Sequence, residues 1–488
     1  MKAKKFSVVA ALFFFLIIQL VNAEVKLPAI VSSNMVLQRN TTVVLWGWAD
    51  ANEKISIEAS WLSENLQLKA DGSGNWRIEV KTTNDKTPQT IKIKGKTSSI
   101  VLDNVLFGEV WLCSGQSNMQ QSLKGYYGQP TFGGSKAIAN SKNFDLRLFS
   151  VSRKGAKEPL KDVENYEAWK EASPENVAGF SAVAYFFGQQ LQEILDVPVG
   201  MIHTSWGGST VQAWISNDML SNYQEVDLTN VDITERTNHI PTALYNAMIH
   251  PLIPYTIKGA LWYQGESNRM EPEKYKDLFP AMVKDWRTRW GNGDFPFYYV
   301  QIAPFIYSGD ENYPEKASNS AYIREAQLKC LDLIPNSGIA ITMDIGDDYC
   351  IHPPKKKEVA DRLLFNALNK TYGFSTVEFS GPVYKSHRIE DGGMFLEFKH
   401  ADSGLFAYDE LTGFEIAGDD KVFYPAQAKL IWGKGLFVKS EHVPNPKAVR
   451  YAWKNWVIGT LYGANLLPAS SFRTDNWDDS TRVKSGTD

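Results

Sequence analysis

Apolar and polar residues alternate in short runs over the first part of the chain. Residues 54–59 and 76–80 alternate with a period of two, residues 42–48 are rich in β-branched and aromatic side chains, and residues 71–75 gather Asp, Gly, Ser and Asn. A period of two is typical of strands that bury one face, and small polar residues with glycine are typical of turns. The pattern predicts a small N-terminal β-sandwich over residues 24–104.

From about residue 105 the pattern changes. Continuous apolar runs, which are typical of buried parallel strands, occupy residues 110–113, 199–202, 257–262, 297–302 and 339–343. Between them, apolar residues recur at intervals of three and four and predict helices over residues 180–195, 273–289, 322–331 and 355–369. Alternating strands and helices predict a doubly wound α/β domain with a parallel sheet over residues 105–372.

Strand-like runs return near the C-terminus, at residues 394–398, 430–432 and 436–438, and Gly, Asp and Pro separate them. They predict a β-rich region over residues 373–488. A chain of 488 residues is long enough for two to four domains, which agrees with three predicted units.

The first 23 residues have the pattern of a targeting segment. Residues 1–5 are basic, residues 6–20 are almost entirely apolar, and Ala23 is the small residue that a signal peptidase requires. The apolar run is shorter than the roughly 20 residues that cross a bilayer. The sequence predicts a signal peptide over residues 1–23, export to the periplasm or the extracellular space, and no stable membrane anchor. An uncleaved anchor is the alternative.

Composition narrows the function classes. Hydrophobic residues make up 43% of the chain and charged residues 22%, which suits a globular protein with a sizeable core. The net charge of -4 does not indicate a nucleic-acid surface. Three cysteines cannot form a disulfide framework, and Cys113 and Cys330 are expected to be small buried side chains. The scattered histidines lack the paired spacing of zinc sites, so no metal is expected.

A polar cluster follows each of four predicted strands. These clusters are residues 114–119, 205–209, 262–268 and 344–353. Because ligands of open α/β sheets bind outside the carboxyl ends of the strands, the clusters are expected to converge at one edge. They contain a serine, a histidine, amide groups and carboxylates, which together form the inventory for acyl transfer.

Two residues of these clusters are the expected reactive groups. Ser117 follows the turn at Gly115, and His352 precedes a helix expected to begin with Pro353. The esterase motif Gly-x-Ser-x-Gly is absent, because Met119 occupies the position of its second glycine.

The chain resembles the sialate O-acetylesterase-like carbohydrate esterases of the SGNH-hydrolase superfamily. The blocks that carry this resemblance are residues 34–38, 107–119, 202–208, 262–268, 351–353, 449–453 and 472–477. They span nearly the whole chain after residue 23. The resemblance implies a flavodoxin-like three-layer catalytic domain, no cofactor, and an acetylated sugar or glycan as the substrate.

The resemblance also implies roles for individual residues. Ser117 is the implied nucleophile and His352 the general base. The backbone N–H groups of Ser117 and Gly208 and the side chain of Gln264 are the implied donors of the oxyanion hole.

The acid of the triad is less directly implied. An Asp commonly stands three residues before the catalytic His in this superfamily, but Tyr349 occupies that position here. The similarity of the Gln-Gly-Glu block favours Glu266 as the acid. The alternatives are Asp347, Asp348 and Asp344.

Two other functions are compatible with the fold. The first is a non-catalytic carbohydrate-binding protein built on the flanking β regions, although such a protein would not need both Ser117 and His352. The second is a thioesterase or lipase, although the sequence contains no wide apolar segment suited to a lid. Sialic acid, xylan and other hemicellulose acetates remain open as substrates.

Overall fold

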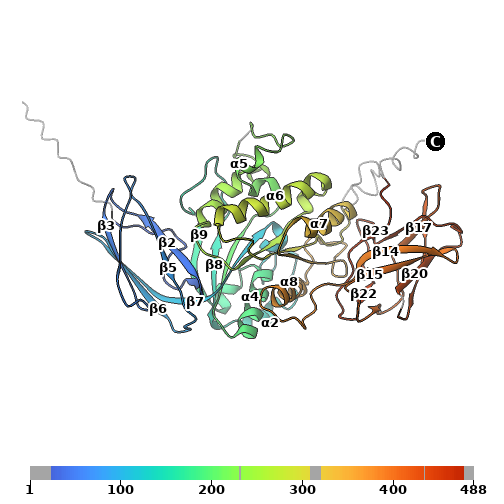
Figure 1. Cartoon of the computed structure of the whole chain (residues 1–488), viewed down its shortest axis with the longest axis horizontal. Coiled ribbons are helices and arrows are strands. Elements are labelled where there is room, and N and C mark those ends of the chain that lie inside the picture. The colour runs from blue at the N-terminus through green and yellow to red at the C-terminus, as the bar shows by residue number, and fades with distance from the viewer. Residues whose placement is uncertain (1–23, 230–231, 308–319, 434, 478–488) are drawn as a thin grey trace, which may run out of the picture.

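The computed structural model describes residues 24–229, 232–307, 320–433 and 435–477 (Figure 1). The predicted signal peptide, residues 1–23, lies outside the described residues. In the described part of the chain, no helix is long and apolar enough to cross a membrane. An N-terminal β region, a central α/β region and a C-terminal β region follow one another along the long axis of the molecule.

The N-terminal region consists of paired antiparallel strands. β2 (Thr42–Trp48) pairs with β5 (Asn75–Lys81), and β3 (Lys54–Ala59) pairs with β4 (Leu66–Lys69) and β6 (Gln89–Lys94). Ile55 and Ile57 of β3 are fully buried, whereas Lys54 is exposed. The alternating pattern therefore identified the strands because one face of each packs into a core.

One long strand, β7 (Ser99–Gly115), joins the N-terminal and central regions. Its first part pairs with β6, residues 106–108 pair with β1 (Val36–Gln38), and residues 109–115 enter the central sheet. Asn104 has a φ of +58° near the point where the strand changes partners. The predicted domain boundary at residue 104 thus falls inside a continuous strand, because the change of pattern marks a change of neighbours.

The central sheet has the strand order β13-β12-β11-β7-β10-β8-β9. All neighbours in it are parallel except β9, which is antiparallel to β8. The strands are β8 (Asn143–Val151), β9 (Tyr166–Ala172), β10 (Val199–Ser205), β11 (Gly259–Tyr263), β12 (Phe297–Val300) and β13 (Ser337–Ala340). The five predicted strands are present, and β8 and β9 extend the sheet beyond the prediction.

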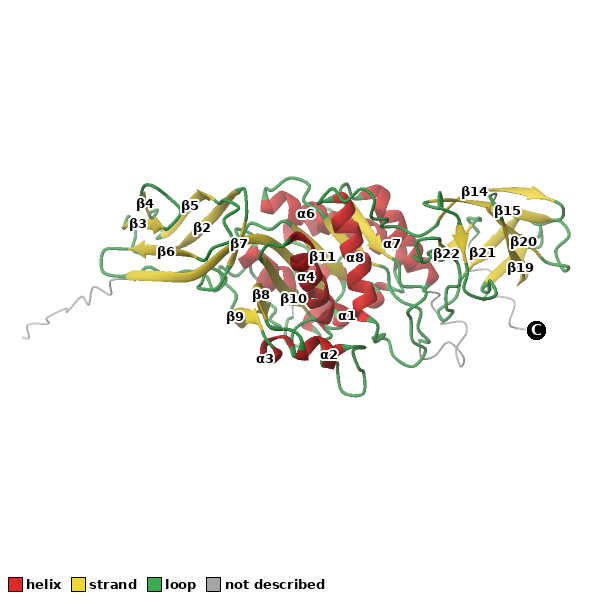
Figure 2. Cartoon of the chain, turned by 90° about the horizontal axis from the view of Figure 1, so that it is seen from below, coloured by secondary structure: helices red, strands yellow, loops and turns green. Residues whose placement is uncertain are grey.

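Helices cover both faces of this sheet (Figure 2). α4 (Ala182–Leu195) and α8 (Lys356–Lys370) pack together, as do α6 (Pro272–Trp290) and α7 (Ala321–Leu333). Alternate residues of β7 enter different cores. Trp111 and Cys113 pack in the cluster that contains α4 and α8, whereas Val110 and Leu112 pack in the cluster that contains α6 and α7. The continuous apolar run reflects this two-sided burial.

Short helices occupy the loops between these elements. They are α1 (Ser117–Gln120), α2 (Gly134–Ala139), α3 (Pro174–Val177) and α5 (Asn217–Leu220). The start of α8 corrects one prediction. The helix begins at Lys356 and not at Pro353. Pro353 is followed by Pro354, and a residue before proline is biased away from the helical conformation.

Two four-stranded sheets and one strand pair form the C-terminal region. The first sheet has the order β14 (Val383–Glu390), β15 (Gly393–Lys399), β20 (Gly435–Lys439) and β19 (Gln427–Ile431). The second has the order β18 (Phe423–Pro425), β17 (Phe414–Ala417), β21 (Ala448–Tyr451) and β23 (Phe472–Arg473). The strand pair is β16 (Leu405–Phe406) with β22 (Tyr462–Gly463).

Candidate active site

Ser117 lies at the point where the strand order of the central sheet reverses. β7 is in the middle of the sheet, with β10 on one side and β11 on the other, and Ser117 begins α1 two residues after β7 ends. Gly115 makes the turn with a φ of +134°, and a Cβ at this position would lie 2.2 Å from the carbonyl oxygen of Tyr263. A glycine at this position therefore allows the strand to deliver Ser117 to the edge where such sheets bind ligands.

The start of α1 and the loop after β10 each carry a backbone N–H group that has no hydrogen-bond partner within the described ranges. A Cβ on Gly207 would lie 3.2 Å from the Cβ of Ser117, so the loop after β10 lies directly against the serine. The N–H of Gly207 donates to Gln120 Oε1 at 3.0 Å. No hydrogen bond within the described ranges uses the N–H of Ser117 or of Gly208. A free N–H group is one requirement for a donor of an oxyanion hole, so the role that the sequence predicted for Ser117 and Gly208 stays open to them.

Gln264 has different hydrogen-bond partners from those expected of an oxyanion donor. Its side chain is fully buried, and its Nε2 donates to Ser209 O at 2.9 Å and to Asn268 Oδ1 at 2.7 Å. Both amide hydrogens are therefore engaged in fixing neighbouring loops. The role of a third oxyanion donor stays a prediction, and it requires this amide to change partners.

The loop that carries His352 contacts the start of α1. Tyr126 donates its hydroxyl hydrogen to Ser117 O at 3.0 Å, and its ring lies edge-on to the His352 ring with centroids 5.3 Å apart. Asn118 Nδ2 donates to Ile351 O at 3.1 Å. The residues next to Ser117 thus hold the histidine loop close to it. No direct hydrogen bond joins Ser117 and His352 in the part of the chain that the structure describes.

His352 is half-buried and has one close polar partner. Its Nδ1 lies 2.5 Å from Gln129 Oε1. Burial, and secondarily the positive charge of Lys356, lowers the pKa of His352 to about 4. The ring is therefore neutral at neutral pH, which is the state that a general base requires.

A buried polar network lies behind Ser117. Asn118 Nδ2 donates to Glu266 Oε1 at 2.6 Å, and Lys356 Nζ donates to Asn118 Oδ1 at 2.5 Å. Burial raises the pKa of Glu266 and lowers that of Lys356 to about 7. The Asn118 amide thus bridges an acid and a base that burial would otherwise disfavour as ions. Glu266 reaches the histidine loop only through Asn118, and its carboxylate makes no hydrogen bond with His352.

The other candidate carboxylates do not contact His352 either. Asp347 Oδ1 accepts the N–H groups of Tyr349 and Cys350, both at 2.9 Å. Asp344 forms a bidentate ion pair with Arg362, in which Nη1 donates to Oδ1 at 2.8 Å and Nη2 donates to Oδ2 at 2.7 Å. Asp348 makes no side-chain hydrogen bond to any residue within the described ranges.

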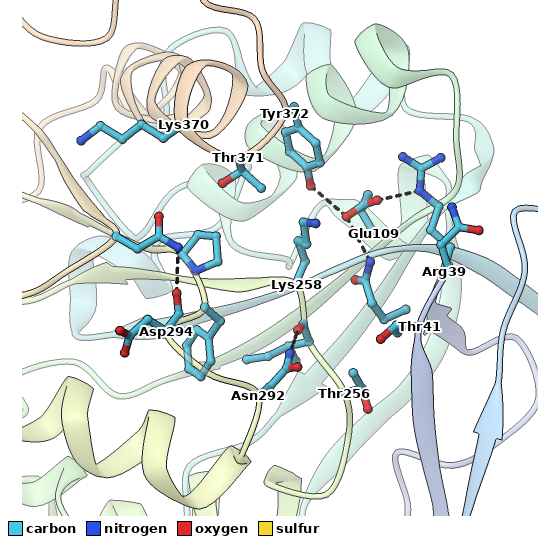
Figure 3. Close-up of a pocket in the computed structure, with 16 residues that line it drawn as sticks. Arg39, Thr41, Glu109, Thr256, Lys258, Asn292, Asp294, Lys370, Thr371 and Tyr372 are labelled. Atoms are coloured by element: carbon cyan, nitrogen blue, oxygen red, sulfur yellow. Dashed lines mark hydrogen bonds and ion pairs between the residues drawn. The ribbon is translucent and has the colours of Figure 1, made fainter.

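The hollow drawn in Figure 3 lies away from these residues. It has a volume of about 580 Å³ and is lined by Arg39, Glu109, Lys258 and Tyr372, among others. The carboxylate of Glu109 accepts hydrogen bonds from Arg39 Nε and from the Tyr372 hydroxyl. These residues lie at the amino ends of the parallel strands, opposite to Ser117, and the hollow contains none of the predicted site residues.

The described residues contain no group of three or more His, Cys, Asp or Glu side chains that could hold a metal ion. Cys113 and Cys330 are buried free thiols, as predicted, and Cys350 is a half-buried free thiol.

Comparison with known proteins assigns the chain to a family. Residues 107–355 match the family described as carbohydrate esterase, sialic acid-specific acetylesterase. A crystal structure of a carbohydrate acetylesterase from Xanthomonas citri is 34% identical, with a TM-score of 0.84, and the match covers 93% of this chain and all of that one. The human sialate O-acetylesterase is 28% identical over 92% of both chains, and the mouse protein is 26% identical.

The chain belongs to this carbohydrate esterase family.

This assignment confirms the family that the sequence blocks resembled and the predicted class of enzyme, a carbohydrate O-acetylesterase. The central region of this carbohydrate esterase, a sheet with parallel strands, also agrees with the predicted α/β class.

Sequence reasoning missed four residues that surround Ser117 and His352. Tyr126 and Gln129 lie in an irregular loop, where no periodic pattern signals them. Lys356 is the first residue of an amphipathic helix, where a lysine is usually exposed, yet its side chain is fully buried. Asn118 stands inside the block of the nucleophile, so its position in the sequence could have indicated a role.

Proposed function

We propose that this esterase removes O-acetyl groups from carbohydrates through an acyl-enzyme on Ser117. The observation that carries the proposal is the position of Ser117 at the turn after β7, against the loop that contains Gly207 and Gly208, with no hydrogen bond in the described residues using the N–H of Ser117 or of Gly208. This position joins a nucleophile to a preformed site for negative charge.

The proposed reaction uses His352 as both base and acid. Its Nε2 takes the proton from Ser117 Oγ while the oxygen attacks the ester carbonyl. The N–H groups of Ser117 and Gly208 stabilise the oxyanion that forms. His352 then gives the proton to the leaving sugar hydroxyl, and a water molecule activated in the same way releases acetate. Contacts of this kind tighten when substrate binds, so the lack of a direct hydrogen bond between Ser117 and His352 does not oppose the mechanism.

Glu266 contributes to this site in the proposal without touching His352. Its buried carboxylate accepts a hydrogen bond from Asn118, which directly follows Ser117, and Asn118 also donates to the carbonyl of Ile351, which directly precedes His352. We therefore assign Glu266 the role of fixing the distance between the nucleophile and the base.

The proposal also covers the type of domain, the substrate class and export. Helices on both faces of the parallel sheet support a three-layer domain of the SGNH-hydrolase type. The names of the mammalian relatives support sialic acid esters as the substrate class, and the name of the Xanthomonas citri enzyme supports an acetylated carbohydrate without specifying the sugar. The pattern of residues 1–23 supports export.

Detection of the acyl-enzyme tests this proposed function. Rapid acid quenching during turnover of an aryl acetate should leave one acetyl group on the peptide that contains Ser117, as seen by mass spectrometry. An acetyl group on no peptide, in a preparation that turns over the ester, would exclude the covalent mechanism. Complete lack of turnover with aryl and sugar acetates would instead favour the carbohydrate-binding alternative. Faster hydrolysis of octanoyl than of acetyl esters would favour the lipase alternative.

A further inference from the structure

We propose that Gln129, and not a carboxylate, holds the imidazole of His352 in the orientation and tautomer needed for catalysis. The inference rests on the proposed function, since it assigns a positioning residue to the general base of that reaction. It follows from the contacts of one tight turn.

Gln129 ends a turn that is fixed at both ends. The N–H of Tyr126 donates to Gln129 O at 2.9 Å, and the N–H of Gln129 donates to Tyr126 O at 3.0 Å. Gly128, with a φ of +69°, allows the chain to reverse within this turn. Gln121 Nε2 donates to Gln129 O at 3.2 Å, which ties the turn to the end of α1. The backbone of Gln129 is therefore held in place.

The same turn contacts both reactive residues. Tyr126 at its start donates to the carbonyl of Ser117, and Gln129 at its end places Oε1 2.5 Å from His352 Nδ1. Gln129 supplies the one side-chain hydrogen bond that the His352 ring makes within the described ranges. The four carboxylates considered as triad acids either contact other groups or make no hydrogen bond.

The chemistry of an amide oxygen determines the tautomer of His352. The oxygen can only accept a hydrogen bond, so Nδ1 must carry the proton and Nε2 must present its lone pair. This is the tautomer that can take a proton from Ser117. A neutral amide does not attract the imidazolium as a carboxylate would, and the low pKa of His352 agrees with a base that has no anionic partner.

Substitutions of Gln129 separate this proposal from a structural role. Gln129→Ala should lower kcat on the order of 100-fold with a smaller change in KM, because a misoriented base affects the chemical step more than binding. Gln129→Glu places a carboxylate at the same distance. It should retain activity and move the acidic limb of the kcat/KM profile upward by about one pH unit or more, because an anion favours the charged ring. Gln67→Glu is the matched control, since Gln67 lies exposed on β4 and receives the same change of charge.

Nitrogen NMR of the His352 ring tests the proposal without any need for turnover. We expect the wild type to carry its proton on Nδ1 and Gln129→Ala to lose that preference. A wild-type ring protonated on Nε2 at neutral pH would overturn the proposal. So would an acidic limb in Gln129→Glu that matches the wild type, or wild-type kcat in folded Gln129→Ala. If the wild type turns over no acetyl ester but shows the expected tautomer, the proposed function fails, whereas the control of the His352 tautomer by Gln129 stands.

Discussion

At the scale of single residues, the proposed chemistry depends on two side chains that lie near opposite ends of the central region in the sequence. In the proposed mechanism Ser117 supplies the attacking oxygen and His352 moves its proton, so neither side chain can act without the other. Residues that act as one unit show strongly non-additive effects when they are removed.

Ser117→Ala and His352→Ala should each lower kcat by several orders of magnitude, about 10⁶-fold in a comparable triad. The double variant should be hardly slower than either single variant. Steady-state turnover of an aryl acetate provides the measurement, and circular dichroism checks the fold. Substantial turnover by Ser117→Ala would contradict the mechanism, and additive losses would show that the two residues act separately.

Lys356 offers a test of the electrostatics of the base. Burial is the main cause of the low pKa of His352, and the charge of Lys356 adds to it. Lys356 itself has a pKa of about 7, so it is protonated over the pH range in which His352 titrates. Lys356→Met should therefore raise the pKa of His352 and move the acidic limb of kcat/KM to higher pH.

The magnitude of kcat is not the relevant measurement for Lys356→Met, because the substitution also removes a hydrogen bond to Asn118. The relevant measurement is the pH at which the acidic limb of kcat/KM lies. Lys357→Met serves as the control, since Lys357 is half-exposed and pairs with Asp361 on the surface of α8. An unchanged acidic limb in Lys356→Met would show that the charge of Lys356 does not reach His352.

At the scale of elements, the turn between β7 and α1 decides where the nucleophile stands. Gly115 has a positive φ, and its Cα faces the backbone of Tyr263 on β11. The strand and the helix are therefore joined by a residue with no space for a side chain.

Gly115→Ala should destabilise the protein by several kcal/mol and reduce activity, because it combines backbone strain of about 1–3 kcal/mol with a clash against backbone atoms. Gly291→Ala separates the two causes. Gly291 follows α6 with a φ of +64°, but a Cβ there would meet no atom within 4 Å. Urea denaturation should show a loss of about 1 kcal/mol for Gly291→Ala, with unchanged activity. Equal losses in the free energy of unfolding for the two variants would mean that the clash with Tyr263 does not add to the backbone strain.

At the scale of the whole molecule, one buried cation joins the C-terminal region to the central region. Arg324 of α7 is fully buried and donates to Ser471 Oγ, to Ala452 O and to Lys454 O. Gln301 adds a second contact, because its Nε2 donates to Ser470 Oγ at 2.8 Å. The C-terminal strands are therefore bound to the esterase region through polar contacts that exclude water.

Arg324→Met should lower the stability of this junction by about 3 kcal/mol, because the carbonyl groups of the C-terminal region lose their donors in a buried place. A lower Tm and earlier proteolytic cleavage near the junction should report it. Arg388→Met is the control. Arg388 pairs with Glu390 and Glu397 on an exposed face of β14, and its loss should cost less than about 1 kcal/mol. Equal effects of the two substitutions would contradict the importance of the buried arginine.

The sequence by itself determined the α/β class of the fold, and it identified Ser117 and His352 as the proposed reactive pair. The period of two, the continuous apolar runs and the helical spacing are local consequences of which faces are buried, so they predicted the strands and helices before any contact was known. Ser117 and His352 were predictable because each follows a buried strand, and parallel strands end at a common edge.

Only the tertiary structure decided how these elements meet and what surrounds the reactive pair. The boundary between the first two regions lies inside a continuous strand, because β7 runs through both. The partner of His352 is Gln129, which is separated from it by 223 positions. Glu266 and Lys356 meet on Asn118, each from a different element. Such contacts depend on the distances between loops in space, which no local pattern of residues encodes.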